Sequence, residues 1–266
     1  MTLKPITSPR QIRLGDADAV PPRGLPKPKH LDDAAQEQVD RITKLQQKLY
    51  ADGRFALLVV LQGRDASGKD GTIRKVFSGV NPMGCVVTSF KAPTELEQEQ
   101  DYLWRIHLRV PPRRMIGIFN RSHYEDVIVP RVHKLIPEKV LSQRFAQIND
   151  FERLLAQNSV VILKFFLHVS RGEQKTRLIE RLENRKKNWK FRAGDLDDRA
   201  LWDEYTKAYR DAIARCSTSW SRWHIVPADH EDARNLLVAR KIADTLDALD
   251  LRYPALDPKL KGIKVK

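Results

Sequence analysis

Residues 55–70 read FALLVVLQGRDASGKD, an apolar run followed at once by a loop rich in glycine and charge. The run FALLVVL is continuous and rich in branched side chains, as expected of a strand that is buried on both faces of a parallel sheet. The loop fits the pattern GxxxxGK, with Gly63, Gly68 and Lys69 at the defining positions. Apolar residues at helical spacing follow over 72–80. This order of strand, loop and helix predicts a phosphate-binding loop, because the glycines turn backbone N–H groups inward and the lysine reaches phosphate.

Two carboxylates distinguish this loop from the usual motif. Asp70 stands where Ser or Thr ordinarily ligates Mg²⁺. Asp65 lies inside the loop, where a carboxylate would repel a bare phosphate. A hard divalent cation between Asp65 and the phosphates would be coordinated by both, and the repulsion between them would be removed. We therefore expect Asp65 to be a metal ligand or to orient the accepting phosphate; the alternative is that it caps the loop by accepting a bond from a backbone N–H.

The rest of the chain alternates predicted strands and helices. Strands are predicted at 85–90, 115–119, 160–169 and 222–226, and helices at 31–49, 94–108, 137–157, 171 onward and 231–249. The helix from 94 begins with the capping-box pair Thr94 and Glu97, and Ser170 and Glu173 form a second such pair. This alternation predicts a three-layer α/β/α sandwich with a five-stranded parallel sheet, whose ligands bind at the carboxyl ends of the strands.

The first 30 residues differ in composition from the rest. They hold six of the fifteen prolines and little apolar periodicity. The pattern predicts an extended arm that is ordered only where it docks, and its simplest interpretation is a solvated leader. One domain is predicted over 31–255, followed by a tail over 256–266.

Length and composition exclude several classes of protein. The chain has 266 residues, 41% hydrophobic and 31% charged, so neither a disordered tail nor a membrane protein is expected. Its two cysteines form no CxxC pattern, and no secretory signal precedes the arm, which favours a cytoplasmic protein without disulfides or a cysteine-based zinc site. The net charge of +14 predicts a polyanionic partner but does not identify it.

A second charged turn follows the strand predicted at 115–119. Asn120 and Arg121 come directly after it, and Glu125 and Asp126 lie one turn later. At the carboxyl edge of a parallel sheet, Arg121 would neutralise charge on a transferred phosphoryl group and Asp126 would hold Mg²⁺. The alternative is that Arg121 and Asp126 pair with each other. His123 is interpreted as a hydrogen-bonded structural histidine in preference to an acid–base group.

Six segments together resemble the polyphosphate kinase 2 family in its short single-domain form. They are GRDASGKDGTIRK (63–75), SFKAPT (89–94), DYLWRIH (101–107), FNRSHYEDV (119–127), ILKFFLHVS (162–170) and WKFRAGDLDDR (189–199). The resemblance covers about residues 30–255 and implies a P-loop kinase fold similar to thymidylate kinase with a helical lid. It also implies dependence on Mg²⁺, with Mn²⁺ as a substitute, and assembly as a homo-oligomer, commonly a tetramer.

The resemblance also implies roles for individual residues. Asp65 and Asp126 would be metal and phosphate ligands, and Lys69 and Arg121 would contact the phosphates. Glu125 resembles the residue of members that accept nucleoside monophosphates as well as diphosphates. The further residues predicted to bind phosphate or nucleotide are Gly63, Arg64, Ala66, Ser67, Gly68, Asp70, Gly71, Thr72, Arg74, Asn120, His123 and Glu125.

The segment 171–199 is strongly basic and follows the fourth predicted strand, where a P-loop kinase carries its lid. Arg177, Arg181 and Arg185 recur on one helix face, which suits a rail along a polyanion. Lys190 and Arg192 are assigned to the same rail. The alternative is a solvated face balanced by acids. Gly194 is interpreted as a helix stop, with an acidic first turn of the next helix after it.

These observations predict a phosphotransferase that moves the terminal phosphoryl group of inorganic polyphosphate onto nucleoside mono- or diphosphates, with no nucleic acid or membrane as partner. Transfer would be reversible and directly in line, with no covalent enzyme intermediate. One alternative is an ATP-dependent nucleoside or nucleotide kinase of the same fold. Another, from a different class, is a basic nucleic-acid-binding module, although no signature of such a module is present.

Overall fold

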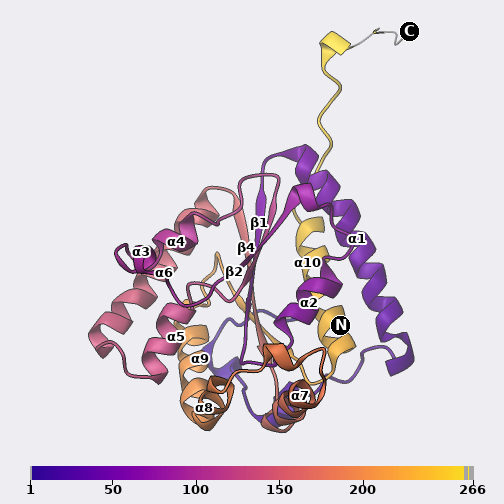
Figure 1. The fold of residues 1–266 in the computed structure, drawn as a ribbon. Coiled ribbons are helices and arrows are strands. Elements are labelled where there is room, and N and C mark those ends of the chain that lie inside the picture. The colour runs from indigo at the N-terminus through magenta and orange to yellow at the C-terminus, as the bar shows by residue number, and fades with distance from the viewer. Residues whose placement is uncertain (1, 261–262, 264–266) are drawn as a thin grey trace.

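The computed structural model describes residues 2–260 and 263, and its centre is a twisted parallel sheet with helices on both faces (Figure 1). The strands are β1 Ala56–Gln62, β2 Cys85–Ser89, β3 Ile116–Asn120, β4 Val160–His168 and β5 Trp223–Pro227. Their order in the sheet is β2-β3-β1-β4-β5, and all neighbours are parallel. Within the described residues, the predicted five-stranded α/β sandwich is confirmed, with each strand within one residue of its predicted ends.

The helices form two layers. Those over the described residues are α1 Leu31–Asp52, α2 Lys69–Val76, α3 Glu95–Gln98, α4 Trp104–His107, α5 Glu125–Val132, α6 Glu138–Gln157, α7 Arg171–Glu183, α8 Gly194–Ala200, α9 Trp202–Cys216 and α10 Glu231–Asp247. Helices α1, α2 and α10 cover one face of the sheet, and α5, α6 and α9 cover the other (Figure 1).

The position of strand β1 in the middle of the sheet explains its continuous apolar sequence. Every residue of it is buried, and its side chains alternate between the two layers. Leu57, Val59 and Leu61 pack under α1, α2 and α10, whereas the alternate residues pack under α5, α6 and α9. Period-two alternation in a strand covered on both sides requires apolar residues at every position.

The register brings the two charged turns to one edge. Leu61 near the end of β1 lies opposite Asn120, the last residue of β3, and opposite Phe165 of β4. The loop after β1 and the turn after β3 therefore leave the sheet side by side, at the carboxyl edge where ligands of such sheets bind.

The helix predicted over 94–108 is wrong as a single element. Helix α3 ends at Gln98 and α4 begins at Trp104. Between them, Asp101 accepts a bond from the Leu103 N–H on its side chain at 2.9 Å, and its carbonyl accepts from the Trp104 N–H at 3.0 Å. Aspartate offers the backbone an alternative to the helical ladder, and here that alternative is adopted. The capping box of Thr94 and Glu97 is present.

Two predictions about the lid segment also need correction. Gly194 is the first residue of α8, so it opens a helix and does not end one; α7 ends earlier, at Glu183. The Ser170 hydroxyl accepts from the Glu173 N–H at 3.1 Å, but the return bond of a capping box is replaced. The Ser170 N–H donates to Asp229 instead, at 2.8 Å, and Glu173 pairs with Arg177.

The N-terminal arm is docked, which corrects its interpretation as a solvated leader. Its Ile6 N–H donates to the Trp223 carbonyl of β5 at 2.8 Å, and the side chains of Ile6, Ile12 and Leu14 are buried in the core. Farther along, the Gly15 carbonyl lies 2.8 Å from Nε2 of His168, at the end of β4. The arm thus gains its order from tertiary contacts, since its own sequence supplies only short 3-10 turns.

The remaining features concern the tail and the search for membrane spans. Within the predicted tail 256–266, residues 261–262 and 264–266 lie outside the described residues. No helix in the described part of the chain is both long and apolar enough to cross a bilayer.

Candidate functional site

The loop between β1 and α2 forms a tight cradle. Gly63 and Gly68 both have positive φ angles, of 155° and 96°. A Cβ on Gly63 would lie 2.7 Å from the Leu167 carbonyl, and a Cβ on Gly68 would collide with the guanidinium of Arg234. Glycine is therefore required at both positions by space as well as by conformation.

Lys69 lies buried at the start of α2 and folds back over the loop. Its Nζ donates to the Gly63 carbonyl at 2.7 Å and to the Arg64 carbonyl at 3.2 Å. Burial, together with the nearby charge of Arg121, lowers the pKa of Lys69 to about 8. A bound phosphate would restore the favourable electrostatics of the charged ammonium.

Two hydroxyl groups of the cradle have no hydrogen-bond partner among the described residues. They are Ser67 Oγ and Thr72 Oγ1, and both are fully buried. Because buried polar atoms are ordinarily hydrogen-bonded, a polar ligand or a water molecule would satisfy these hydroxyls. Ser67 lies in the loop and Thr72 in the first turn of α2, where an oxyanion or a hydrated cation would fit.

Asp65 and Arg121 form an ion pair that joins the loop to the turn after β3. Arg121 Nη2 donates to Asp65 Oδ1 at 2.8 Å. Burial acts to raise the pKa of Asp65, but Lys69 and Arg121 outweigh it and hold that pKa below its ordinary value. Arg121 itself has a φ of 64°, the left-handed conformation that few residues other than glycine adopt.

Glu125 completes this cluster from the first turn of α5. Its side chain is half-buried, and burial raises the pKa of its carboxyl group despite the charges of Arg121 and Lys69. With its amide nitrogen turned toward Glu125, the Gln62 side chain donates to Oε1 at 2.9 Å and accepts from Ser122. The turn after β3 is therefore tied directly to the end of β1.

Asp126 has a different cationic partner. Arg105 of α4 donates to Asp126 Oδ2 at 3.2 Å and to the Lys91 carbonyl at 2.8 Å. The alternative pairing of Arg121 with Asp126 is thus wrong, because Arg121 pairs with Asp65. That Asp65 and Asp126 share one cation stays a prediction.

The carboxylates of this site fit a hard divalent cation. Asp65, Glu125 and Asp126 carry carboxylate oxygens, which hard divalent cations prefer as ligands. Among the described residues, no group of three or more His, Cys, Asp or Glu side chains is arranged to hold a metal unaided. Such a cation would take its other ligands from water and substrate phosphates, as Mg²⁺ ordinarily does.

The lid reaches the loop through Asp70. Asn120 Nδ2 donates to Asp70 Oδ1 at 2.8 Å, and Lys190 lies 3.4 Å from Oδ2. Asp70, at the position of the usual Ser or Thr, therefore links the turn after β3 to the lid. Gly71 is close-packed beside Glu231, whereas Arg74 is exposed on α2.

The predicted cationic rail on α7 is only partly present. Arg177 is engaged by protein, since it donates to the carbonyls of Ala66 (3.0 Å), Ala228 (2.7 Å) and Asp229 (3.0 Å). These bonds tie α7 to the loop after β1 and to the loop after β5. The assignment of Arg177 as a polyanion contact stays a prediction. Arg181 lies 3.6 Å from Asp195, and its charge acts on Asp65. Arg185 and Arg192 are exposed.

Two other predicted ligands are held by protein. His123 is buried, with Nε2 3.2 Å from Glu152, which agrees with the structural interpretation; its assignment as a nucleotide-binding group stays a prediction. Arg64 is buried with its guanidinium 3.9 Å from the ring centroid of Trp202, and burial lowers its pKa to about 10. It donates to the Trp202 carbonyl at 3.2 Å.

Two arginines near the site were not found from the sequence. Arg105 lay in a recognised segment, DYLWRIH, but the pattern gave no sign that it faces Asp126. Arg234, in α10, is buried against Gly68, and burial lowers its pKa to about 10. Both are placed by contacts between segments far apart in the chain, and local spacing does not reveal such contacts.

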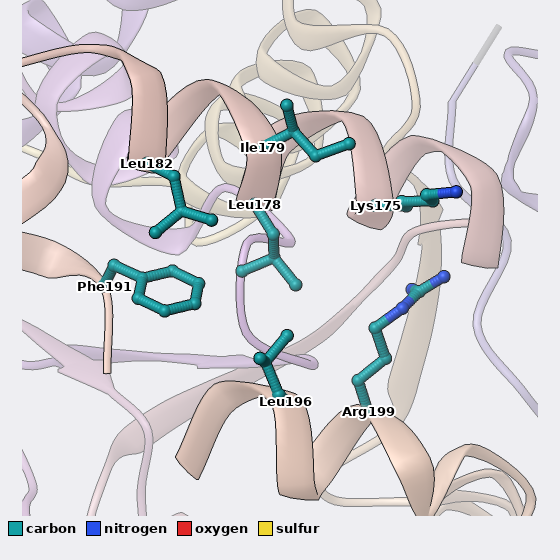
Figure 2. Close-up of a pocket in the computed structure, with 7 residues that line it drawn as sticks. All are labelled: Lys175, Leu178, Ile179, Leu182, Phe191, Leu196 and Arg199. Atoms are coloured by element: carbon teal, nitrogen blue, oxygen red, sulfur yellow. The ribbon is translucent and has the colours of Figure 1, made fainter. Parts of the chain in front are cut away.

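A separate hollow of about 370 Å³ lies in the lid between α7 and α8 (Figure 2). Leu178, Ile179, Leu182, Phe191 and Leu196 line it, with Lys175 and Arg199 at one end. Its apolar lining differs from the charged cradle.

Comparisons with known proteins agree with this geometry. The chain matches the family model for polyphosphate kinase 2 (PPK2) over residues 27–254. An AMP/ADP-polyphosphate phosphotransferase of Meiothermus ruber is 54% identical over 214 residues, 80% of each chain. An ADP-polyphosphate phosphotransferase of Rhodopseudomonas palustris is 39% identical over 94% of this chain and 93% of its own. The crystal structure of polyphosphate kinase 2 from Arthrobacter aurescens TC1 matches with a TM-score of 0.88 and 38% identity, over 96% of this chain and 95% of that chain.

Proposed function

The chain belongs to the polyphosphate kinase 2 family, and from this premise we propose that it transfers the terminal phosphoryl group of inorganic polyphosphate to nucleoside mono- and diphosphates. The observation that carries the proposal is the cluster of Lys69, Asp65, Arg121 and Glu125 at the mouth of a glycine cradle with unpartnered hydroxyls. The substrates follow from the names of the relatives, which combine polyphosphate with AMP or ADP.

The residues of the cluster have separate tasks in this reaction. Lys69 neutralises charge on the phosphoryl group, and Arg121 does so from the opposite turn. Asp65, by pairing with Arg121 at 2.8 Å, orients that guanidinium as well as offering oxygen to a cation. A divalent cation, Mg²⁺ or Mn²⁺, would be held by Asp65, Glu125 or Asp126 and would supply further charge neutralisation to the phosphates.

No strong base is needed, because the oxygen of the accepting phosphate is already anionic. Catalysis then consists of holding the two phosphates in line and compensating their charge. Transfer is direct and reversible, with no covalent enzyme intermediate. Arg181 and Lys190 carry positive charge from the lid toward the cradle, where they would hold the polyphosphate chain.

Three further properties belong to the same proposal. The protein acts in the cytoplasm, it assembles as a homo-oligomer, commonly a tetramer in families of this kind, and its anionic partner is polyphosphate and not nucleic acid. The excess of 48 Lys and Arg over 34 Asp and Glu suits a polyanion that has no bases to read.

The test is an assay of nucleotide products with polyphosphate as the donor. ADP should give ATP, AMP should give ADP, and GMP and GDP show the base preference. Lys69→Ala should lower kcat by about 100- to 1,000-fold, the scale of losing one preorganised charge contact, while the fold survives. Lys75→Ala is the matched control, because Lys75 lies on the same helix but pairs with Asp32 at 2.7 Å.

Two results would contradict the proposal. A Lys69→Ala variant with turnover near that of the wild type would remove the loop from the chemistry. A wild-type protein that phosphorylates nucleosides from ATP and leaves polyphosphate untouched would support the nucleoside-kinase alternative. Competition between polyphosphate and DNA for binding distinguishes the third alternative, a nucleic-acid-binding module.

A further inference from the structure

A charged cluster lies deep in the molecule, beneath the turn after β3. Lys164, in β4, has no solvent exposure, and its ammonium makes three contacts. Nζ lies 2.8 Å from Tyr124 Oη, 2.5 Å from Glu152 Oε2 and 2.7 Å from the Cys216 carbonyl. All three of its donors are used, so the charge of Lys164 is fully compensated by protein.

Glu152, in α6, completes the cluster from the other side. Its Oε1 accepts from Tyr124 Oη at 2.9 Å and lies 3.2 Å from His123 Nε2. Its Oε2 accepts from Lys164. One carboxylate and one ammonium therefore bind the side chains of two consecutive residues, His123 and Tyr124.

His123 and Tyr124 lie in the middle of the turn after β3, which carries the charged residues of the site. Arg121 lies two residues before His123, in a left-handed conformation with φ 64°, and Glu125 and Asp126 directly follow Tyr124. A left-handed conformation outside glycine persists only where the surroundings enforce it. Anchoring the side chains of His123 and Tyr124 to β4 and α6 supplies that enforcement.

Stability does not explain the cluster. Replacing a buried ion pair by apolar groups of similar size is often neutral or stabilising, whereas removing one partner leaves an uncompensated buried charge. The pair also packs among apolar and aromatic groups, with Lys164 Nζ 5.2 Å from the ring centroid of Trp223. An apolar pair could fill the same volume, but it would leave the Tyr124 hydroxyl, the His123 imidazole and the Cys216 carbonyl without these partners.

We propose that Lys164 and Glu152 are positioning residues for phosphoryl transfer, which fix Arg121, Glu125 and Asp126 through the side chains of His123 and Tyr124. This inference rests on the proposed function, because it assigns the pair a task in that reaction. Neither residue touches the substrate in this scheme. Their contribution is the placement of the turn, and small displacements of reacting groups have large effects on rate.

The main test is the double variant Lys164→Met with Glu152→Leu, which removes both charges and keeps the volume. Unfolding should stay cooperative, because no buried charge is left uncompensated, but the midpoint should fall, because Tyr124 Oη and the Cys216 carbonyl lose their partner Lys164. The value of kcat should fall by about 100-fold and KM for polyphosphate and nucleotide should stay within about twofold, the signature of lost alignment and not of lost binding.

A milder variant keeps the test decisive if the double variant fails to fold. Tyr124→Phe leaves the Lys164–Glu152 pair in place and removes one hydroxyl; we expect kcat to fall by about tenfold at unchanged KM. Ile42→Ala is the control for stability alone, because Ile42 is buried in the layer of α1 and α10, on the other side of the sheet. It should lower the unfolding midpoint without lowering kcat.

Either Tyr124→Phe or a folded double variant with wild-type kcat would overturn the inference while the proposed function stands, since the wild type is active in the same assay. The inference would also be overturned if the double variant raised KM and lowered kcat together and Ile42→Ala did the same. Such a result would show that the loss of activity follows from lost stability alone. A wild type without polyphosphate-dependent turnover would overturn the proposed function, and this inference with it.

Discussion

Burial displaces the pKa values of single residues in this protein from their values in water. His224, in β5, is 3% exposed, with Nδ1 3.4 Å from the Lys164 carbonyl. Burial, reinforced by the positive charge of Lys241, lowers the pKa of His224 to about 4. Lys69 is shifted in the same direction for the same principal reason, but its environment opens to the loop, where an anion can reverse the shift.

The shift of His224 predicts a dependence of stability on pH. Between pH 6.5 and about 4, the unfolded chain binds a proton at this residue that the folded chain refuses, so stability falls as the pH is lowered. At pH 5 this loss amounts to about 2 kcal/mol relative to pH 7. Urea unfolding of the wild type and of His224→Gln at both pH values measures it.

The comparison of the two proteins isolates His224 from the other titrating groups. Because the carboxylates and His168 are common to both, their contributions cancel in the difference. The His224→Gln variant should lose less stability on acidification than the wild type does. Equal losses in the two proteins would contradict the assignment.

At the scale of elements, α7 divides its arginines between support and binding. Arg177 donates to three loop carbonyls and to Glu173, so it belongs to the folded framework. Arg181, one turn further, has a single long contact of 3.6 Å with Asp195. The i, i+4 spacing correctly places both on one helix face, but only the three-dimensional contacts separate their roles.

This division predicts opposite consequences for two similar substitutions. Arg177→Met should lower the free energy of unfolding by about 2–3 kcal/mol, because several charge-assisted bonds to the loop are lost. Arg181→Met should leave stability unchanged and raise KM for polyphosphate by about tenfold, because the lid loses a cation whose contact with Asp195 is long and weak. Urea unfolding and steady-state kinetics on both variants decide between this assignment and a uniform rail, for which both would change KM alike.

The elements themselves were largely predictable from the sequence. Strand β1 and the loop after it have a strong local signature, because burial on both faces forces apolar residues at every position and the cradle requires Gly63 and Gly68. The break between α3 and α4 was not predicted, because the Asp101 carboxylate accepts a bond from the Leu103 N–H, and this bond competes with a capped and otherwise helical pattern. The partners of Asp65 and Asp126 were predictable in type, as cations, but not in identity.

At the scale of the whole molecule, most charged site residues lie in a different region from the apolar contacts that hold the helices to the sheet. The carboxyl edge of the sheet gathers the charged turns and the lid, whereas the two layers of helices are held by continuous apolar contacts. The N-terminal arm connects these regions, since Ile6 pairs with β5 and Asp16 accepts from the first backbone N–H of α7 at 3.0 Å. The docking of the arm was not predicted, because its proline content indicates an extended segment. The alternation of apolar Ile12, charged Arg13 and apolar Leu14 is too short to outweigh that indication.

That alternation supplies the last prediction. Ile12 is 4% exposed in the core, whereas its neighbour Arg13 is exposed to solvent. Ile12→Ala should lower the free energy of unfolding by about 2–4 kcal/mol, because it removes buried methyl groups and leaves a cavity. Arg13→Ala is the matched control and should change it by less than about 0.5 kcal/mol. Denaturant unfolding of both variants tests this directly; if both proved as stable as the wild type, the arm would be the solvated leader that its proline content suggests, and its contacts with β4, β5 and the lid would contribute nothing to the fold.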